Sequence, residues 1–195
     1  MQSDLGRGTR EARLVVRPAR LEDASAIARI YNQGIEERIA TFETEPRTVA
    51  QMAEWLREKE GHYPVIVAER DGRVLAWAGV GSYRPRPCYN GVAEFSIYAD
   101  REARGTGAAQ AALQGLIDAC ERAGFTKLVS RIFPENVRSR GLCRKVGFRE
   151  VGVYRRHGKL DGAWRDTVIV ERLLGEALEG LEEEPTGPQS GNRFW

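Results

Sequence analysis

A run of small residues with one arginine stands between an apolar alternating segment and a helical pattern. It comprises Arg104, Gly105, Thr106, Gly107, Ala108 and Ala109. The first amides of a helix have no intrahelical partner and lie at the positive end of the helix dipole, so they favour an anion. Glycine lets the backbone approach a phosphate closely. The run lacks the spacing of a dinucleotide fold or a P-loop. Alone, it predicts either a phosphate cradle or a tight turn.

Glu94 is a carboxylate within the apolar strand pattern of residues 92–99. Strand alternation places Glu94 and Ser96 on one face and Phe95 and Ile97 on the other. A charge inside such a strand is costly unless it is paired or used chemically. The alternative is an edge-strand glutamate that faces water, and the strand alone leaves both interpretations open.

Arg84 and Arg86 lie two residues apart on a segment stiffened by prolines. In an extended segment they can point the same way, and guanidinium groups bind carboxylate or phosphinate through forked hydrogen bonds. The segment therefore predicts an anion-binding loop, with an ordinary solvated loop as the alternative.

The elements that must position these residues follow one another as β α α β β β α β α β β. Strands are expected at 12–19, on both sides of Asp71-Gly72 within 64–83, at 92–99, at 127–133 and twice within 148–174; helices are expected at 20–35, 47–60, 108–124 and 134–147. The mixed order indicates an α/β or α+β domain with a mostly antiparallel sheet covered by helices.

Composition narrows the class of protein. The chain has 195 residues, with 30 Lys+Arg against 28 Asp+Glu, so it lacks the strongly basic balance typical of nucleic-acid binding. It has no apolar run near the ~20 residues of a membrane helix and no apolar signal segment at its start. Three widely spaced cysteines and two histidines argue against a disulfide framework, a zinc site or another metal site. We expect a cytoplasmic protein with reduced thiols.

Two segments resemble the GNAT acetyltransferases. "EFSIYADREARGTGAA" is similar to their fourth strand and coenzyme A loop, and "PENVRSRGLCRKVGF" to the asparagine and helix that follow. "IYNQGIEERIATFETEPRT", "YRPRPCYNGVAEFSIYA" and "HGKLDGAWRDTVIVERLL" resemble the phosphinothricin and arsinothricin N-acetyltransferase branch. The resemblance covers residues 13–174. It implies a sheet of six to seven strands with about four helices. The ends at 1–12 and 175–195 are expected to be flexible, the second because it is acidic and then rich in Pro, Gly and Ser.

The resemblance implies acetyl transfer from acetyl-CoA to an amine, with Glu94 as the general base and no metal. The implied coenzyme A contacts are Ile97, Tyr98, Ala99, Arg104, Gly105, Thr106, Gly107, Ala108, Ala109 and Asn136. Backbone amides near Ile97 or Tyr98 would stabilise the oxyanion. Cys143 stands where relatives have a tyrosine or histidine that protonates the departing thiolate. It is either that proton donor or a small buried residue, with water as the donor.

The resemblance also implies an amino-acid-like acceptor with an acidic side group, held by Arg84, Arg86 and Tyr89 beside an aromatic wall at Phe42. Trp164 is expected at the acceptor site or at a homodimer contact, and His157 is expected to be a surface or structural residue. The implied acceptor is phosphinothricin or arsinothricin, so that acetylation confers resistance. Alternatives are methionine sulfone or sulfoximine, a protein amine, or a non-catalytic acyl-CoA-binding role.

Overall fold

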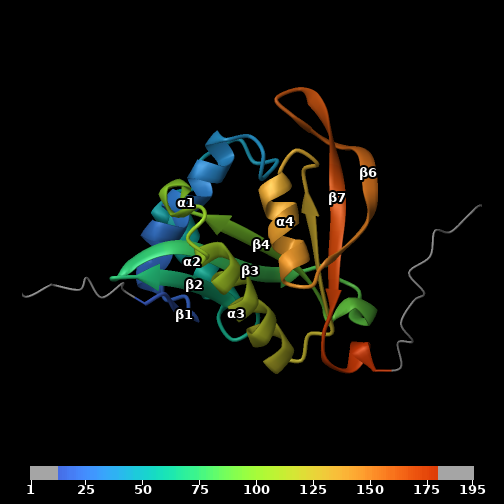
Figure 1. Ribbon diagram of the computed structural model, residues 1–195, viewed down its shortest axis with the longest axis horizontal. Coiled ribbons are helices and arrows are strands. Elements are labelled where there is room, and N and C mark those ends of the chain that lie inside the picture. Colours follow the sequence, from blue (N-terminus) through green and yellow to red (C-terminus); the bar gives the residue numbers. More distant parts are fainter. Residues whose placement is uncertain (1–12, 180–195) are drawn as a thin grey trace, which may run out of the picture.

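Seven strands form one sheet in the computed structural model, which describes residues 13–179 (Figure 1). The strands are β1 (Val15–Pro18), β2 (Val65–Arg70), β3 (Arg73–Ser82), β4 (Val92–Ala99), β5 (Lys127–Ile132), β6 (Arg149–Leu160) and β7 (Ala163–Leu173); the helices are α1 (Ala24–Glu36), α2 (Val49–Lys59), α3 (Ala108–Arg122) and α4 (Val137–Lys145). The strand order is β1-β2-β3-β4-β5-β7-β6, antiparallel except between β4 and β5. The predicted element order and mostly antiparallel sheet are confirmed.

Local signals account for several of these elements. Asp71-Gly72 and Asp161-Gly162 each have two positive φ angles, +52° and +73°, then +48° and +79°, as tight hairpin turns require. Thr48 caps α2 by accepting a hydrogen bond from the Gln51 amide at 3.2 Å. A short 3-10 helix (Gly175–Leu178) extends regular structure past residue 174. Residues 1–12 and 180–195, which include most of the predicted flexible ends, lie outside the described residues.

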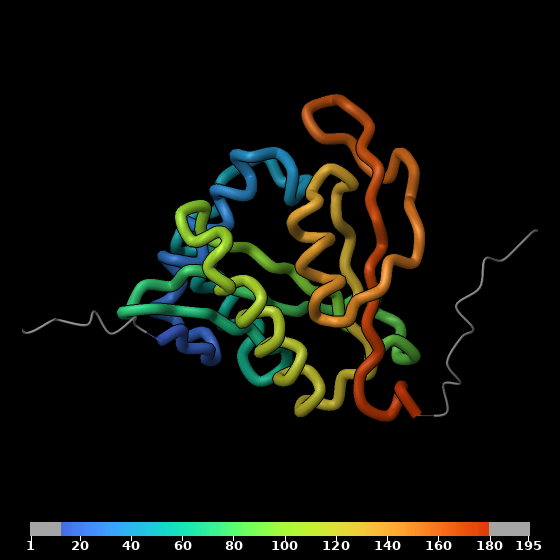
Figure 2. The backbone as a smooth tube through the Cα atoms, in the orientation of Figure 1, coloured from blue at the N-terminus to red at the C-terminus, as the bar shows by residue number. Residues whose placement is uncertain are grey.

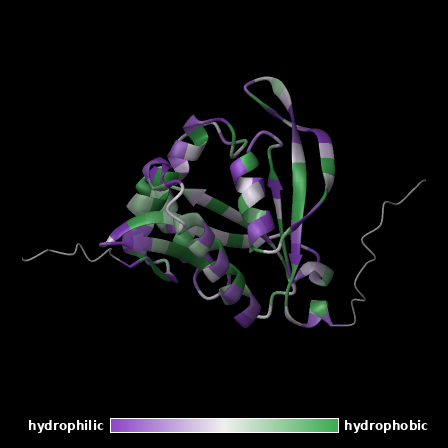
Figure 3. Ribbon diagram, viewed as in Figure 1, coloured by the Kyte–Doolittle hydropathy of each residue, from purple (hydrophilic) through white to green (hydrophobic). Residues whose placement is uncertain are grey.

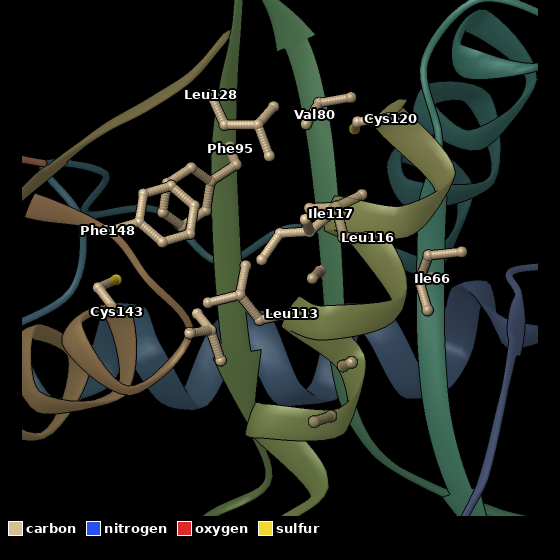
Figure 4. Packing of buried hydrophobic residues seen from close by; sticks show 14 of the residues in the cluster. Ile66, Val80, Phe95, Leu113, Leu116, Ile117, Cys120, Leu128, Cys143 and Phe148 are labelled. Carbon is tan, nitrogen blue, oxygen red and sulfur yellow. The ribbon is translucent and has the colours of Figure 1, made fainter. Parts of the chain in front are cut away.

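At β2 and β3 the sheet is apolar on both faces and covered on both. Val65 and Val67 of β2 pack with α1 and α2, whereas Ile66 and Ala68 pack on the side of α3 and α4. Figure 4 shows Phe95 and Phe148 beside Leu113 in the second of these cores. Figure 3 shows a hydrophobic stretch along β7, and Val168 and Val170 of this strand are buried. None of the helices within residues 13–179 combines the length and the apolar character needed to cross a membrane.

The parallel pair β4–β5 is short. Its register joins Val92, Ala93 and Glu94 to residues 127–129, and no β5 partner follows for the remainder of β4 in the described sheet. The strands diverge from this point. Backbone groups on that edge of β4, from Phe95 onward, therefore have no strand partner on β5.

Candidate active site

Two cavities meet along the diverging part of β4. One, here called the α3 cavity, has a volume of about 680 Å³ and reaches the start of α3. The other, the Glu94 cavity, has a volume of about 510 Å³ and contains the Glu94 side chain. They share a wall formed by Ala40, Ile97, Tyr98, Asn136 and Ser139. Two molecules bound in the two cavities would therefore meet beside β4.

The α3 cavity has the chemistry of an anion site. Gly105 and Gly107 line it with φ angles of +81° and +85°, a region that disfavours other residues. Gly107 immediately precedes α3, so the amides of the first helical turn face this end without intrahelical acceptors. Arg138 and Lys145 of α4, which the sequence reading missed, also line the cavity. Phosphate groups fit this combination of amides and cations.

Most of the predicted coenzyme A contacts line this cavity. They are Ile97, Tyr98, Ala99, Arg104, Gly105, Gly107, Ala109 and Asn136. Thr106 and Ala108 do not: the Thr106 hydroxyl donates to the Ala103 carbonyl at 2.6 Å, and Ala108 is buried. Arg104 donates to the Glu37 carboxylate at 2.6 Å and remains 35% exposed, so it can also reach a bound anion.

Asn136 ties two segments of the shared wall together. Its side-chain oxygen accepts a hydrogen bond from the Ser139 amide at 3.1 Å and so caps α4. Its amide nitrogen donates to the Ile39 carbonyl at 3.1 Å. Figure 2 shows the loop between α1 and α2 reaching across to the start of α4. Asn136 thus holds the wall that separates the cavities.

Glu94 lies in its cavity as an ion pair with Arg131 of β5. Arg131 Nη2 donates to Glu94 Oε2 at 2.6 Å, and Nε donates to Oε1 at 3.0 Å. The two side chains are 30% and 44% exposed. Glu94 is therefore less buried than its strand context predicted, and its charge is compensated by a partner. Arg131 was missed because its contact depends on the β4–β5 register.

His157, expected to be a surface or structural residue, is exposed and also lines the Glu94 cavity. The β6–β7 ladder shifts register between Tyr154 and Gly158, and Arg156 adopts a positive φ of +49°. Such a bulge redirects the side chains of a strand. It brings His157 Nε2 to 3.4 Å from Arg131 Nη1. The sequence of β6 has no regular alternation from which this bulge could be located.

Phe42 lines the Glu94 cavity, and its role as a wall of the acceptor site stays a prediction. Its ring packs edge-on to Phe133 with the centroids 4.8 Å apart, and both residues line the Glu94 cavity. A Cβ atom on Gly158 would come within 2.8 Å of the Phe42 ring. Gly158 therefore permits the close approach that fixes this aromatic wall.

Tyr98 borders both cavities and remains protonated. Burial raises the pKa of its hydroxyl well above the ordinary value, with the charge of Tyr31 as a smaller cause. Its ring stacks on Trp77 with the centroids 5.1 Å apart, and its hydroxyl donates to the Ala40 carbonyl at 3.4 Å. The ring therefore packs in the core, as the alternative had it, and its contact with coenzyme A stays a prediction.

Cys143 lies in the core and lines neither cavity. Its side chain is 0% exposed, and Figure 4 shows it beside Phe148. Burial, aided by the charge of Glu150, raises the pKa of the Cys143 thiol to about 12. The geometry corresponds to the alternative of a small buried residue and gives the role of proton donor no support.

Four predicted acceptor-binding residues do not line the Glu94 cavity in this chain: Arg84, Arg86, Tyr89 and Trp164. Arg84 and Arg86 are exposed, and the Arg84 guanidinium lies 5.2 Å from the centre of the Tyr83 ring. Trp164 is 54% exposed near the tip of the β6–β7 hairpin. Their binding roles stay predictions. No group of three or more His, Cys, Asp or Glu side chains within residues 13–179 is placed to hold a metal ion.

Comparison with known proteins identifies the family. Residues 13–149 match the acetyltransferase (GNAT) domain model. The chain belongs to the GNAT acetyltransferases. It is 35% identical over 170 residues to phosphinothricin N-acetyltransferase from Alcaligenes faecalis, covering 86% of each chain. It is 32% identical to L-methionine sulfoximine/L-methionine sulfone acetyltransferase from Pseudomonas paraeruginosa, covering 82% of this chain and 94% of that one.

A solved structure extends the similarity to three dimensions. Phosphinothricin acetyltransferase from Sinorhizobium meliloti, crystallised in complex with acetyl-CoA, superposes with a TM-score of 0.79 at 32% identity, covering 90% of this chain and 96% of that one. The present chain is an acetyl-CoA-dependent N-acetyltransferase. The expected family, fold and cosubstrate are thereby confirmed.

Proposed function

We propose that the protein transfers the acetyl group of acetyl-CoA to the α-amino group of an amino-acid-like toxin with an acidic side group, phosphinothricin or arsinothricin, and so confers resistance. One observation carries the proposal: the Glu94 carboxylate lies in a cavity that shares a wall with the anion-binding α3 cavity. The names of the Alcaligenes and Sinorhizobium relatives support phosphinothricin as the acceptor. We also expect a cytoplasmic homodimer.

In this proposal, acetyl-CoA occupies the α3 cavity with its phosphates at Gly105, Gly107 and the start of α3. Its pantetheine arm follows the edge of β4 that has no partner on β5. Backbone amides near Ile97 or Tyr98 donate to the carbonyl oxygen of the acetyl group, where negative charge develops. The reacting carbon then lies at the wall between the two cavities.

Glu94 accepts one proton from the acceptor's ammonium group, directly or through water. The freed amine nitrogen forms a bond to the acetyl carbon. The carbon–sulfur bond breaks, and its electron pair goes to sulfur. The second proton lost by nitrogen reaches the thiolate through water, because Cys143 lies outside both cavities. The products are the N-acetyl amino acid and coenzyme A.

Methionine sulfone or sulfoximine is the second candidate acceptor, favoured by the name of the Pseudomonas relative. These compounds present a tetrahedral side group like that of phosphinothricin. The candidate acceptors are compared by measuring thiol release from acetyl-CoA. The compounds tested are phosphinothricin, arsinothricin, methionine sulfone, methionine sulfoximine and ordinary amino acids. We expect the highest kcat/KM with phosphinothricin or arsinothricin. The absence of turnover with every compound contradicts the proposal.

A further inference from the structure

The Glu94–Arg131 ion pair faces the space that the acceptor must enter. Both side chains line the Glu94 cavity and both keep contact with solvent. Among the described residues that line this cavity, only Arg131 is a lysine or an arginine. The cavity therefore presents a carboxylate and a guanidinium side by side.

This pairing competes with proton transfer to Glu94. A carboxylate bound through both oxygens to a guanidinium has one lone pair of each oxygen already occupied. A general base must come within hydrogen-bond reach of the proton that it accepts. An ammonium group that takes the oxygen positions now bound by Arg131 opens the ion pair at least in part.

A free α-amino acid carries the charges that would replace this pair. Its ammonium and carboxylate groups are attached to one carbon, so they lie as close together as the two side chains do. The ammonium group complements Glu94, and the carboxylate complements Arg131. Because each charge of the pair gains a new partner as it loses the old one, the exchange leaves neither Glu94 nor Arg131 unpaired.

We propose that the acceptor enters by exchanging ion pairs, so that its α-ammonium group takes Glu94 and its α-carboxylate takes Arg131. This inference rests on the proposed function and restricts it to acceptors with a free α-carboxylate. Arg131 is then a specificity residue, and the same exchange releases the Glu94 oxygens for proton transfer.

The geometry of Arg131 suits this role. Its Nε and Nη2 atoms, which now contact Glu94, form the fork that binds a carboxylate through two parallel hydrogen bonds. Its Nη1 atom lies 3.4 Å from His157 Nε2 on the neighbouring hairpin. His157 can thus hold one end of the guanidinium while the fork changes partner. An amide or peptide acceptor would offer the fork no anion.

The test compares two acceptors, phosphinothricin and methionine sulfone, with their α-carboxamides in wild type, Arg131→Gln and Arg131→Lys. We expect wild-type kcat/KM to favour each free acid by roughly tenfold to a hundredfold, the range of charge-assisted hydrogen bonds. Arg131→Gln should raise KM for the acids and leave kcat/KM for the carboxamides unchanged or higher. The ratio of kcat/KM for the acid to kcat/KM for its carboxamide should then fall to about one. Arg131→Lys, which keeps the charge without the fork, should retain part of the preference.

Arg144→Gln is the matched control, since Arg144 is exposed and lines neither cavity. It should keep the wild-type ratio, and coenzyme A titration should show equal Kd values for all the folded variants. An equal loss for acids and carboxamides in Arg131→Gln, or an unchanged ratio, overturns this inference alone. A wild type that acetylates neither acids nor carboxamides overturns the proposed function as well.

Discussion

Glu94 can be tested by a change that keeps the size of its side chain. Glu94→Gln removes the proton acceptor, and we expect kcat to fall by about 10²- to 10⁴-fold, the usual contribution of a general base. The variant also loses the ion pair with Arg131, but a partly exposed pair contributes only about 0–1 kcal/mol to stability. Steady-state kinetics and thermal unfolding measure the two effects separately.

The coenzyme A affinity is the internal control for that variant, because Glu94 does not line the α3 cavity. We expect the Kd for coenzyme A to match the wild type. A Glu94→Gln enzyme with wild-type kcat rules out the general-base role, and it would favour a non-catalytic function of the carboxylate.

The three cysteines should differ in reactivity. Cys88 is exposed, whereas burial raises the pKa of Cys120 and Cys143 to about 12. Thiolate is the reactive form of cysteine, so at pH 8 Cys88 should react with a disulfide reagent while the other two remain protected. Counting released chromophore should give about one thiol in the native protein and three after denaturation. Rapid labelling of Cys143 in the native state would show that it is accessible after all.

At the scale of elements, Asp100 connects β4 with the turn that leads to α3. The buried carboxylate accepts hydrogen bonds from Arg29 at 2.5 Å and Arg73 at 2.9 Å, and from the Glu102 amide at 3.2 Å. Burial opposes its ionisation, but the arginine hydrogen bonds prevail and hold the pKa of Asp100 well below its usual range. The carboxylate thereby anchors the turn that leads to Gly105.

Asp100→Asn should destabilise the fold by about 2 kcal/mol at pH 7, since the arginines lose a buried charge partner. The folded-state pKa is lowered, so this stabilisation is present above the unfolded pKa of about 3.9 and disappears as pH falls below it. Urea unfolding at several pH values should show the difference between wild type and variant narrowing below about pH 4. The KM for acetyl-CoA should rise with the displaced loop.

Glu102→Gln provides the comparison, because Glu102 pairs with Arg73 but is 71% exposed. Its effect on unfolding should stay below about 1 kcal/mol. A destabilisation by Asp100→Asn that persists unchanged at pH 3 is inconsistent with the assigned ion pairs.

Local signals predicted the elements well and the contacts between distant elements poorly. The Asp-Gly turns, the Thr48 cap and the glycines before α3 act through their own backbone preferences, which the sequence displays directly. The partnership of Glu94 with Arg131 depends instead on the pairing of Glu94 with Val129 across two parallel strands. That register is set by packing of the whole sheet, so neither strand pattern reveals it. The same holds for His157, which a bulge redirects.

At the scale of the molecule, the edge strand β6 carries an exposed apolar surface. Val151 and Val153 are 49% and 52% exposed on a strand that pairs only with β7 in the described sheet. Natural edge strands usually avoid such surfaces unless they are covered. This surface supports the predicted homodimer as an association along the β6–β7 hairpin, which projects from the body in Figure 1.

Val153→Lys should therefore shift the protein from dimer to monomer in sedimentation equilibrium, because a lysine at a paired apolar surface loses its hydration. Arg122→Lys, at the end of α3 and away from β6, should leave the dimer unchanged. A wild-type protein that sediments as a monomer at micromolar concentration contradicts the predicted homodimer.

The wall shared by the two cavities has a consequence for inhibitor design. A single compound that joins an amino acid to coenzyme A through its sulfur would pass Ile97 and Tyr98 and fill both cavities at once. Binding of one half would raise the effective concentration of the other at its own site. Such a bisubstrate compound should bind more tightly than either half. The gain in affinity should be greatest when the linker spans the two cavities beside β4 without strain.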